Sequence, residues 1–338
     1  MEAQPVRAEA QEAAPARTRG RLILAGESLR LAFFGTPEFA VPTLRRLIEG
    51  RHEVVSVVCQ PDRRRGRGRH TSAAPIADVA LEPGLELLRP ERIADAQCVA
   101  ALAARRPDLG VVVAFGQFIP KKIRELPSLG YMINGHASLL PRHRGAAPIV
   151  RCLLAGDSET AVSAMRVERE MDAGPVALQH RITIGPSENA GQLAARMSEL
   201  TAEVLEQTLE AIVEGRVVWT PQDASLATEA PKIGAADAML DWRESAEALA
   251  RQVRAMAPAP GAFTRLDDEK LRILQADFTS DPVDVAPGTL SVDSEGELRI
   301  ATRNGWLVPR VLQRPGKRPL PVADFVRGRP IEDGASVG

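Results

Sequence analysis

The sequence contains few of the residues on which small secreted or metal-stabilised domains depend. Only three of its 338 residues are cysteines, and Cys59, Cys98 and Cys152 are far apart and form no CxxC pair. An odd number of separated cysteines supports neither a disulfide framework nor a cysteine-rich zinc site. A reducing, cytoplasmic location is therefore expected.

Long hydrophobic runs and aromatic residues are also scarce. No apolar run approaches the roughly 20 residues that a membrane-spanning helix needs, and the first 30 residues hold no compact apolar segment ending in a cleavage site. Aromatic residues make up 4% of the chain, with a single tyrosine. The sequence thus predicts neither a membrane partner nor export, and it argues against a binding surface of stacked rings.

The chain has no excess of charge of either sign. Its 43 lysines and arginines balance 44 aspartates and glutamates, leaving a net charge of -1. The molecule as a whole is therefore not attracted to polyanions, and any such binding must come from a local patch. What the chain does have is 44% hydrophobic residues over 338 positions, enough for two globular domains at about 100 to 200 residues each.

Residues 1–28 differ in composition from the rest of the chain. They are rich in Ala, Glu, Arg and Pro without sustained apolar periodicity, which predicts a disordered extension. Their arginines loosely suggest a transit peptide, but Glu2, Glu9 and Glu12 argue against one. A plain tail or a mis-set start fits better.

From residue 29 to residue 215, short apolar strands alternate with amphipathic helices. Strands are expected at 31–34, 54–59, 109–115 and 132–134, helices at 37–49, 74–81 and 93–105, and two more strands within 160–184. A long helix then begins with Ser187 as its N-cap and ends at Gly215. This alternation predicts a doubly wound, mostly parallel α/β sheet, in which ligands bind beyond the carboxyl ends of the strands.

The remainder of the chain has a different pattern. Residues 216–238 contain prolines and many small residues and are interpreted as a linker. In residues 239–330, a helix at 245–256 precedes five short apolar segments separated by turn residues, near 262–266, 271–278, 289–292, 297–302 and 306–312. That spacing predicts a small antiparallel β-barrel.

Candidate catalytic residues follow the strand expected at 132–134. Asn134 and His136 are two residues apart, so along an extended backbone they project to the same side. An amide can stabilise a developing oxyanion and an imidazole exchanges protons near neutral pH, a combination that suits acyl transfer. Asp172, just before a turn at Gly174-Pro175, adds a carboxylate that would fix the tautomer of the imidazole if the two meet.

Each of these residues alone also has a simpler explanation. Asn134 fits a strand-end turn, Asp172 fits a turn-forming aspartate, and His136 fits a structural hydrogen bond as well as it fits catalysis. His143, flanked by two arginines, is most simply a solvated loop histidine. A zinc site of His136, His143 and Asp172 lacks an HExxH-like spacing, so no metal is expected.

A series of motifs runs along the chain in a fixed order. The signature is Asn134-Gly135-His136-Ala137-Ser138-Leu139-Leu140-Pro141 followed by Arg144-Gly145-Ala146-Ala147-Pro148-Ile149. Further matches are Phe34-Gly35-Thr36-Pro37-Glu38-Phe39, Gln60-Pro61-Asp62-Arg63, Gly66-Arg67-Gly68, Val112-Val113-Ala114-Phe115-Gly116, Met171-Asp172-Ala173-Gly174-Pro175, Pro231-Lys232-Ile233, Leu240-Asp241-Trp242, Pro287-Gly288-Thr289, Leu312-Gln313 and Gly316-Lys317-Arg318. They span nearly everything after residue 28, and their order is highly specific. In these motifs the chain resembles the 10-formyltetrahydrofolate-dependent formyltransferases, most closely the branch of that family that acts on methionyl-tRNA.

The resemblance implies an architecture and an activity. It implies a Rossmann-like catalytic domain followed by an OB-like β-barrel that helps to hold tRNA. It implies formyl transfer from 10-formyltetrahydrofolate to the amino group of initiator methionyl-tRNA, with Asn134, His136 and Asp172 as catalytic residues. Folate would contact Ser138, Leu139, Leu140 and Pro141. A monomer is expected.

An arginine-rich loop after the second strand is the candidate contact to tRNA. Without context it fits a solvated loop, but the resemblance makes Arg63, Arg67 and Arg69 candidates for phosphate contacts. Lys317 and Arg318, together with Arg310 and Arg314, form a second candidate patch on the barrel.

The sequence departs from the family pattern at three places. Gly135 stands where a small branched or apolar residue is common, residues 257–260 lack an aromatic residue often found there, and residues 234–238 lack an acidic pair, which puts the contribution of Lys232 in doubt.

Other functions fit less well. Formylation of a nucleotide or amino sugar, or hydrolysis of formyltetrahydrofolate, leaves the barrel and the arginine loop without a purpose. A nicotinamide-dependent oxidoreductase would need a GxGxxG turn where this chain has Gly35-Thr36-Pro37. A non-catalytic RNA-binding module leaves Asn134, His136 and Asp172 unused.

Overall fold

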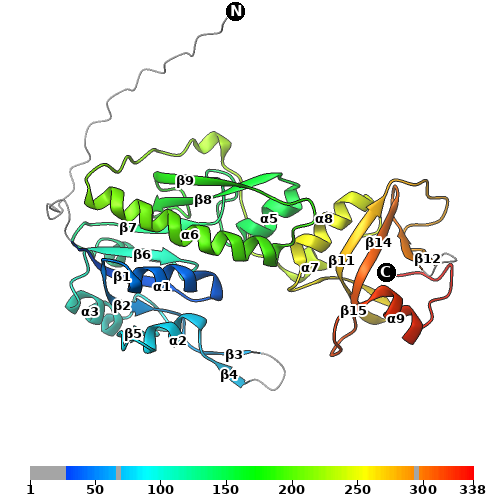
Figure 1. The fold of residues 1–338 in the computed structure, drawn as a ribbon, viewed down its shortest axis with the longest axis horizontal. Helices are drawn as coiled ribbons and strands as arrows, with labels where there is room; N and C mark the ends of the chain where they lie inside the picture. The colour runs from blue at the N-terminus through cyan, green and yellow to red at the C-terminus, as the bar shows by residue number, and fades with distance from the viewer. Residues whose placement is uncertain (1–27, 66–69, 293–296) are drawn as a thin grey trace, which may run out of the picture.

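The computed structural model describes residues 28–65, 70–292 and 297–338 of the chain (Figure 1). The extension predicted for residues 1–28 lies outside the described residues except for Ser28. Two bodies, each with its own hydrophobic core, follow one another along the chain.

The first body is built on a seven-stranded sheet with the order β5-β2-β1-β6-β7-β8-β9. The first five strands in this order run parallel, and β8 and β9 are antiparallel to their neighbours. The strands are β1 (Arg30–Gly35), β2 (Glu53–Val58), β5 (Leu87–Leu88), β6 (Leu109–Val113), β7 (Met132–His136), β8 (Glu159–Arg166) and β9 (Val176–Thr183). The predicted doubly wound, mostly parallel sheet is confirmed.

Helices cover the two faces of this sheet. They are α1 (Val41–Glu49), preceded by the 3-10 turn η1 (Glu38–Ala40), α2 (Pro75–Leu81), α3 (Ala96–Ala104), α4 (Lys121–Arg124), α5 (Pro148–Ala155) and α6 (Ala190–Val213). The longest, α6, lies along the sheet beside α1 and buries the apolar stripe expected from its sequence, from Leu193 to Ile212 (Figure 1). Its predicted N-cap was wrong, because Asn189 and not Ser187 accepts the Gln192 N–H in a capping box.

The arginine-rich segment contains a short hairpin. Strands β3 (Arg63–Arg65) and β4 (His70–Ser72) pair in antiparallel fashion and project from the first body (Figure 1). The hairpin was not expected, because three-residue strands rich in arginine have no apolar alternation to reveal them.

The second body is a curled antiparallel sheet with the order β10-β11-β14-β13-β12, and β15 pairs with β14. Its strands are β10 (Ala262–Leu266), β11 (Glu269–Thr279), β12 (Leu290–Val292), β13 (Leu298–Ala301), β14 (Trp306–Gln313) and β15 (Leu320–Pro321). Helices α8 (Ala246–Met256) and α9 (Val322–Gly328) pack against β14. The predicted OB-like barrel is confirmed as an open, half-closed one, with β15 and α9 as unpredicted additions.

The two bodies are joined by packing as well as by the chain. Helix α5 of the first contacts α8 of the second, and Val150 and Leu154 pack against the second core. Residues 216–238, interpreted from sequence as a linker, include the 3-10 turn η2 (Ala224–Leu226) and helix α7 (Ala235–Ala238). Arg151 of α5 pairs with Asp237 of α7 at 2.8 Å.

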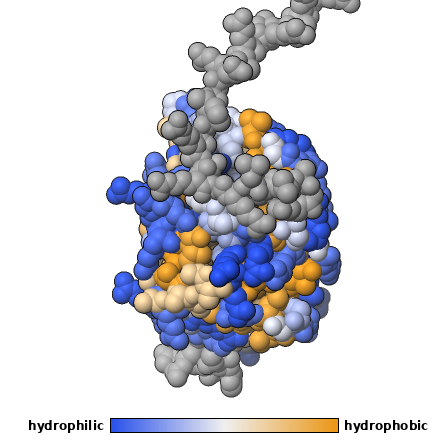
Figure 2. Space-filling view, turned by 90° about the vertical axis from the view of Figure 1, so that its left-hand side faces the viewer, coloured by the Kyte–Doolittle hydropathy of each residue, from blue (hydrophilic) through white to orange (hydrophobic). Residues whose placement is uncertain are grey.

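The surface is mixed in character. Viewed from the end formed by the first body, hydrophobic areas are small and bordered by hydrophilic side chains (Figure 2). Among the described residues, no helix is both long and apolar enough to cross a membrane.

Candidate active site

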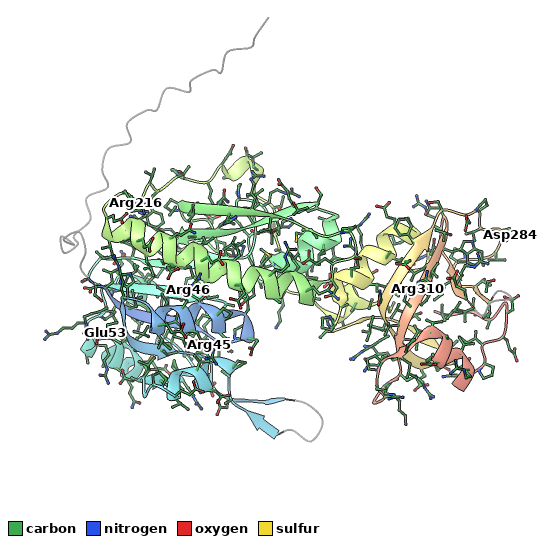
Figure 3. The ribbon with its side chains drawn as sticks, in the orientation of Figure 1. Arg45, Arg46, Glu53, Arg216, Asp284 and Arg310 are labelled. Carbon is green, nitrogen blue, oxygen red and sulfur yellow. The ribbon has the colours of Figure 1, made fainter. Side chains whose placement is uncertain are left out.

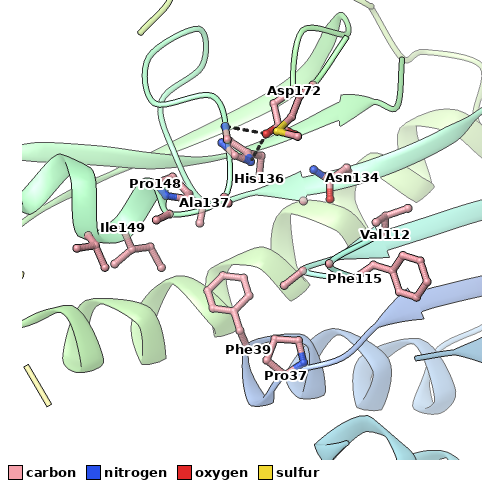
Figure 4. A pocket seen from close by; sticks show the side chains of 18 of the residues that line it. Pro37, Phe39, Val112, Phe115, Asn134, His136, Ala137, Pro148, Ile149 and Asp172 are labelled. Atoms are coloured by element: carbon pink, nitrogen blue, oxygen red, sulfur yellow. Dashed lines mark hydrogen bonds and ion pairs between the residues drawn. The ribbon is translucent and has the colours of Figure 1, made fainter. Parts of the chain in front are cut away.

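A cavity of about 840 Å³ opens at the carboxyl ends of the parallel strands. The chain runs from β1 to β2 on one side of the sheet and returns to β6 on the other, so the sheet order reverses between β1 and β6. Ligands collect at such switch points. The wall includes Pro37 after β1, the loop after β6, both candidate residues of β7, and the turn between β8 and β9 (Figure 4).

His136 ends β7 and is held on both sides of its ring. Its Nε2 lies 3.0 Å from the carbonyl oxygen of His143, and its Nδ1 lies 3.6 Å from Oδ2 of Asp172. A carbonyl oxygen can only accept, so Nε2 carries a hydrogen and donates it. Nδ1 is left facing the carboxylate, where a proton taken up by the ring would bridge the two groups.

Asp172 lies in the loop, residues 167–175, that joins β8 and β9. Its backbone has a φ of 52°, in the left-handed region, and its Oδ2 also accepts the Gly145 N–H at 2.9 Å. Gly174 closes the turn, because a Cβ there would lie 2.0 Å from the Arg166 carbonyl oxygen. The turn therefore brings together Asp172 and His136, which are 36 positions apart in the sequence.

Asn134 lies two residues before His136 on β7 and lines the same cavity. Its side chain is directed into the space between His136 and the wall formed by Val112 and Phe115 (Figure 4). An amide donor, an imidazole and a carboxylate thus surround one point of a largely apolar cavity. Such a set can stabilise an oxyanion and move a proton beside it.

Comparison with known proteins identifies the family. The formyl transferase family model matches residues 29–209, and the model of the formyl transferase C-terminal domain matches residues 232–330. The methionyl-tRNA formyltransferase of Citrifermentans bemidjiense is 40% identical over 310 residues, covering 92% of this chain and 96% of that protein. That of Roseiflexus castenholzii is 42% identical over 313 residues, covering 92% and 99%. This chain belongs to the methionyl-tRNA formyltransferase family.

Solved structures show that the formyltransferase fold extends beyond close relatives. HypX from Aquifex aeolicus in complex with tetrahydrofolic acid superposes with a TM-score of 0.60 at 20% identity, and this chain spans about half its length, 49%. An N-formyltransferase from Helicobacter canadensis superposes with a TM-score of 0.62 at 13% identity, covering 85% of this chain and 99% of that one. At these identities the likeness concerns the fold alone.

The four residues predicted to line the folate form a turn beside the cavity of this formyltransferase family member. Ser138 is fully buried, and its hydroxyl donates to the Arg142 carbonyl at 2.6 Å. The carbonyl of Leu140 accepts from Gln179 at 2.9 Å. The described lining of the cavity runs through Ala137 and resumes at Gly145, so Ser138, Leu139, Leu140 and Pro141 lie outside it.

The wall opposite His136 follows β6, at one of the strand ends where the sequence predicts ligand binding. It is formed by residues 114–119 after β6, and the Phe118 ring on its rim is 63% exposed. Thr36 holds this wall, because its hydroxyl donates to the Phe115 carbonyl at 2.9 Å, and Gln60 donates to the same oxygen at 3.0 Å. In the sequence, the motif Val112-Val113-Ala114-Phe115-Gly116 indicates this wall, because it covers the end of β6 and the start of the loop that lines the cavity.

The interpretation of His143 as a solvated loop histidine was wrong. The residue is 7% exposed, and its Nε2 lies 2.7 Å from Oδ2 of Asp157, whose other oxygen pairs with Arg142 at 2.6 Å. The sequence suggested solvation because two arginines flank it, but Asp157 after α5 supplies a buried partner.

The candidate tRNA-contacting residues are spread over both bodies. Arg67 and Arg69 lie outside the described residues, and the side chain of Arg63 is likewise not described. Lys317 and Arg318 are exposed in the turn before β15. Arg310 instead pairs with Asp277 and Glu297, and Arg314 with Glu269, so half of the second predicted patch is neutralised (Figure 3).

The described residues include possible metal ligands and cysteine thiols, the groups that metal binding and thiol chemistry need. Within the described ranges, no group of three or more histidine, cysteine, aspartate or glutamate side chains is placed to hold a metal ion. All three cysteines are free and buried. Burial raises the pKa of the Cys59 thiol to about 11 and that of Cys152 to about 12, and it raises the pKa of Cys98 above its ordinary value.

Proposed function

We propose that this protein transfers a formyl group from 10-formyltetrahydrofolate to the α-amino group of methionyl initiator tRNA, producing N-formylmethionyl-tRNA for translation initiation. The observation that carries the proposal is the convergence of Asn134, His136 and Asp172 on one cavity at the switch point of the sheet. Membership of the methionyl-tRNA formyltransferase family supplies the substrates.

The cavity suits a folate. Its volume of about 840 Å³ lies within the roughly 300 to 1,000 Å³ typical of sites for small organic ligands. Val112, Phe115 and Ile119 offer an apolar wall for a flat ring beside Asn134. When bound, 10-formyltetrahydrofolate supplies an activated formyl carbon. The predicted contacts at residues 138–141 would then act from outside this wall, by shaping the turn after His136.

The chemistry assigned to the three polar residues follows from their geometry. An α-amino group has a pKa of about 7.7 to 8.0, so near pH 7 an appreciable fraction is neutral and can attack a formyl carbon. The attack forms a C–N bond and places negative charge on the formyl oxygen. Asn134 and protonated His136 stabilise that charge. Collapse breaks the bond to the folate nitrogen, which takes up a proton as it leaves and so balances the proton lost by the amine, and no covalent enzyme intermediate forms.

Asp172 completes the assignment by holding the ring of His136 and helping to collect the proton of the attacking amine. Its carboxylate is 15% exposed, enough to exchange a proton with the cavity while staying hydrogen-bonded to the Gly145 N–H. We assign no metal to this mechanism, since an amine nucleophile and an activated formyl donor need no Lewis acid.

The partner is recognised by charge and shape in this proposal. Arg63, Arg67 and Arg69 of the arginine-rich segment, with Lys317 and Arg318 of the turn before β15, provide cations for tRNA phosphates. The protein acts as a monomer in the cytoplasm, where charged initiator tRNA is available and its buried thiols stay reduced.

A panel of formyl acceptors tests the proposal. The purified protein is incubated with 10-formyltetrahydrofolate and, separately, with initiator methionyl-tRNA, elongator methionyl-tRNA, an amino-sugar nucleotide or no acceptor. Formylated methionine on the initiator tRNA is the expected result. Product only on the sugar, or release of formate in every tube, would replace tRNA formylation by the alternatives of small-amine formylation or folate hydrolysis.

A further inference from the structure

The segment between the two bodies crosses both loops of the candidate active site. This crossing segment, residues 220–230, pairs first with β9, where Thr220 and Val176 exchange two backbone hydrogen bonds of 2.8 and 2.9 Å. It then follows the loop after His136, where Thr228 and Ala230 hydrogen-bond with residues between Pro141 and Ala147. The crossing segment thus contacts the two loops that meet at Asp172 and Gly145.

One side chain of the crossing segment connects these loops directly. The Gln222 Nε2 donates to the carbonyl oxygens of Asp172 at 2.8 Å and Gly174 at 2.7 Å. Its Oε1 accepts from Nε and Nη2 of Arg144 at 3.0 and 2.8 Å. Both N–H groups and both acceptor lone pairs of the Gln222 amide are therefore used within the site.

The loop that carries Asp172 needs such support. Asp172 has a left-handed φ of 52°, a conformation that a non-glycine residue keeps only when its surroundings hold it. The neighbouring Met171 is 65% exposed and Glu170 is exposed, so little packing fixes the loop from the solvent side. The Gly145 N–H holds the carboxylate itself, while Gln222 holds the backbone on either side of Ala173.

We propose that Gln222 is a positioning residue for formyl transfer, which fixes the Asp172 carboxylate against Nδ1 of His136. The inference rests on the proposed function, because it assigns Gln222 to the same reaction. Arg144 works with it by orienting the amide, so that its N–H groups and not its oxygen face the two carbonyls. Losing the amide lets the turn relax, and the 3.6 Å separation of Asp172 and His136 is no longer held.

The chemistry of the position is specific to an amide. A glutamate of the same shape would still accept from Arg144 but has no N–H groups for the two carbonyls. Gln222→Glu therefore removes the two hydrogen bonds to the Asp172 and Gly174 carbonyls with little change in side-chain volume. Gln222→Ala removes these hydrogen bonds together with the packing of the side chain. Agreement between the two variants excludes a simple packing effect.

Gln252 offers a matched control. It is half-buried like Gln222, and its Nε2 also donates to two backbone carbonyls, those of Asp237 at 2.8 Å and Met239 at 3.0 Å. It belongs to α8 and takes no part in the candidate active site. Gln252→Ala therefore reports what losing two such hydrogen bonds does to the protein in general.

The test is single-turnover formylation of initiator methionyl-tRNA with enzyme in excess. For Gln222→Ala and Gln222→Glu we expect the transfer rate to fall on the order of 10- to 100-fold, since small displacements of a catalytic group cost that much. The apparent affinities for 10-formyltetrahydrofolate and for tRNA should change less than about 2-fold, and Gln252→Ala should transfer at the wild-type rate. A rate of Gln222→Glu equal to that of wild type would overturn the proposal.

Two further measurements separate positioning from general damage. In an Asp172→Asn background, Gln222→Ala should slow transfer little further, because both changes affect the same pair; an equal loss in both backgrounds would contradict the proposal. Hydrogen exchange of residues 168–175 should speed up in Gln222→Ala but not in Gln252→Ala, and this readout needs no activity. Failure of wild-type protein to formylate the tRNA would instead refute the proposed function.

Discussion

His136 is held by acceptors on opposite sides of its ring, one a backbone carbonyl and the other a carboxylate. The carbonyl of His143 takes the Nε2 hydrogen, which leaves Nδ1 for Asp172. His143 can present that carbonyl because its own ring is fixed by Asp157 and its backbone is left-handed, with a φ of 59°. The orientation of the candidate catalytic histidine is therefore determined partly by His143 and Asp157, which do not line the cavity.

The three polar residues should matter for turnover and not for folate binding. We expect Asn134→Ala, His136→Ala and Asp172→Ala each to lower the transfer rate by about 10²- to 10⁴-fold, because each removes a group that acts on charge or protons formed only during reaction. Folate affinity, measured by titration calorimetry, should stay within a few-fold, since apolar walls supply most of the contact. A near-normal rate in any variant would remove that residue from the mechanism.

The cysteines should be chemically silent in the folded protein. With burial raising the pKa of Cys59 to about 11 and that of Cys152 to about 12, the neutral thiol is favoured on folding. This preference for the neutral thiol contributes fully to the free energy of unfolding below pH 9. The contribution is lost as the pH rises through the pKa values of the two thiols in the folded protein. At pH 8, about one Cys59 thiol in a thousand is a thiolate, so we expect alkylation by iodoacetamide to be slow until denaturant is added. Rapid native labelling, read by mass spectrometry, would contradict the burial described.

At the level of secondary structure, the close approach of α6 to β7 depends on the absence of a Cβ at Gly135. A Cβ on Gly135 would lie 2.6 Å from Cγ2 of Thr201 and 3.0 Å from Cδ1 of Leu205. The glycine that departs from the family pattern thus allows α6 to pack directly on the strand that carries Asn134 and His136.

Adding a methyl group at this contact should be costly. We expect Gly135→Ala to lower the free energy of unfolding by about 1 to 3 kcal/mol through overpacking. Thr201→Ser removes Cγ2 but keeps the hydroxyl that donates to the Met197 carbonyl, so the double variant should recover much of the loss. Chemical denaturation measures all three proteins; equal losses in the single and double variants would rule out the steric explanation.

Most elements were predictable, whereas the contacts that shape the site were not. The buried valines of β6 and the apolar stripe of α6 could be predicted, because the spacing of apolar residues along a short stretch of sequence indicates which side chains are buried. Ser187 and Asn189 are both favourable N-cap residues, so the sequence alone does not fix where α6 begins. The pairing of His143 with Asp157 and of Gln222 with the Asp172 turn joins distant residues, so no local pattern could reveal either.

Across the whole molecule, the balance of 43 cations and 44 anions conceals an uneven distribution. Arg310 lies on the second body, paired with Asp277 and Glu297, and Arg216 near the far end of the first is paired with Glu214 (Figure 3). Within the described part of the chain, Lys317 and Arg318 have no carboxylate partner within ion-pair distance. These two cations of the second body therefore remain available to a polyanion, whereas Arg310 and Arg216 are neutralised.

Binding of tRNA should accordingly depend on salt through a small number of residues. Each lost phosphate contact should lower the slope of log affinity against log salt by about 0.7 to 0.9. We expect Arg67→Ala and Arg318→Ala to weaken tRNA binding and reduce this slope, whereas Arg216→Ala leaves both unchanged. Filter binding at several salt concentrations gives the slopes, and identical slopes for all the proteins would remove these residues from the interface.

The central claim is that one cavity receives a formylated folate and the amine of methionyl-tRNA and joins them. It is tested most directly by following a formyl label from 10-formyltetrahydrofolate in a single turnover with initiator methionyl-tRNA. The account predicts that label appears on the α-amino group of the methionine as fast as it leaves the folate, with His136→Ala slowing both alike. Label recovered as free formate, or tRNA left unlabelled while the folate is consumed, would contradict it.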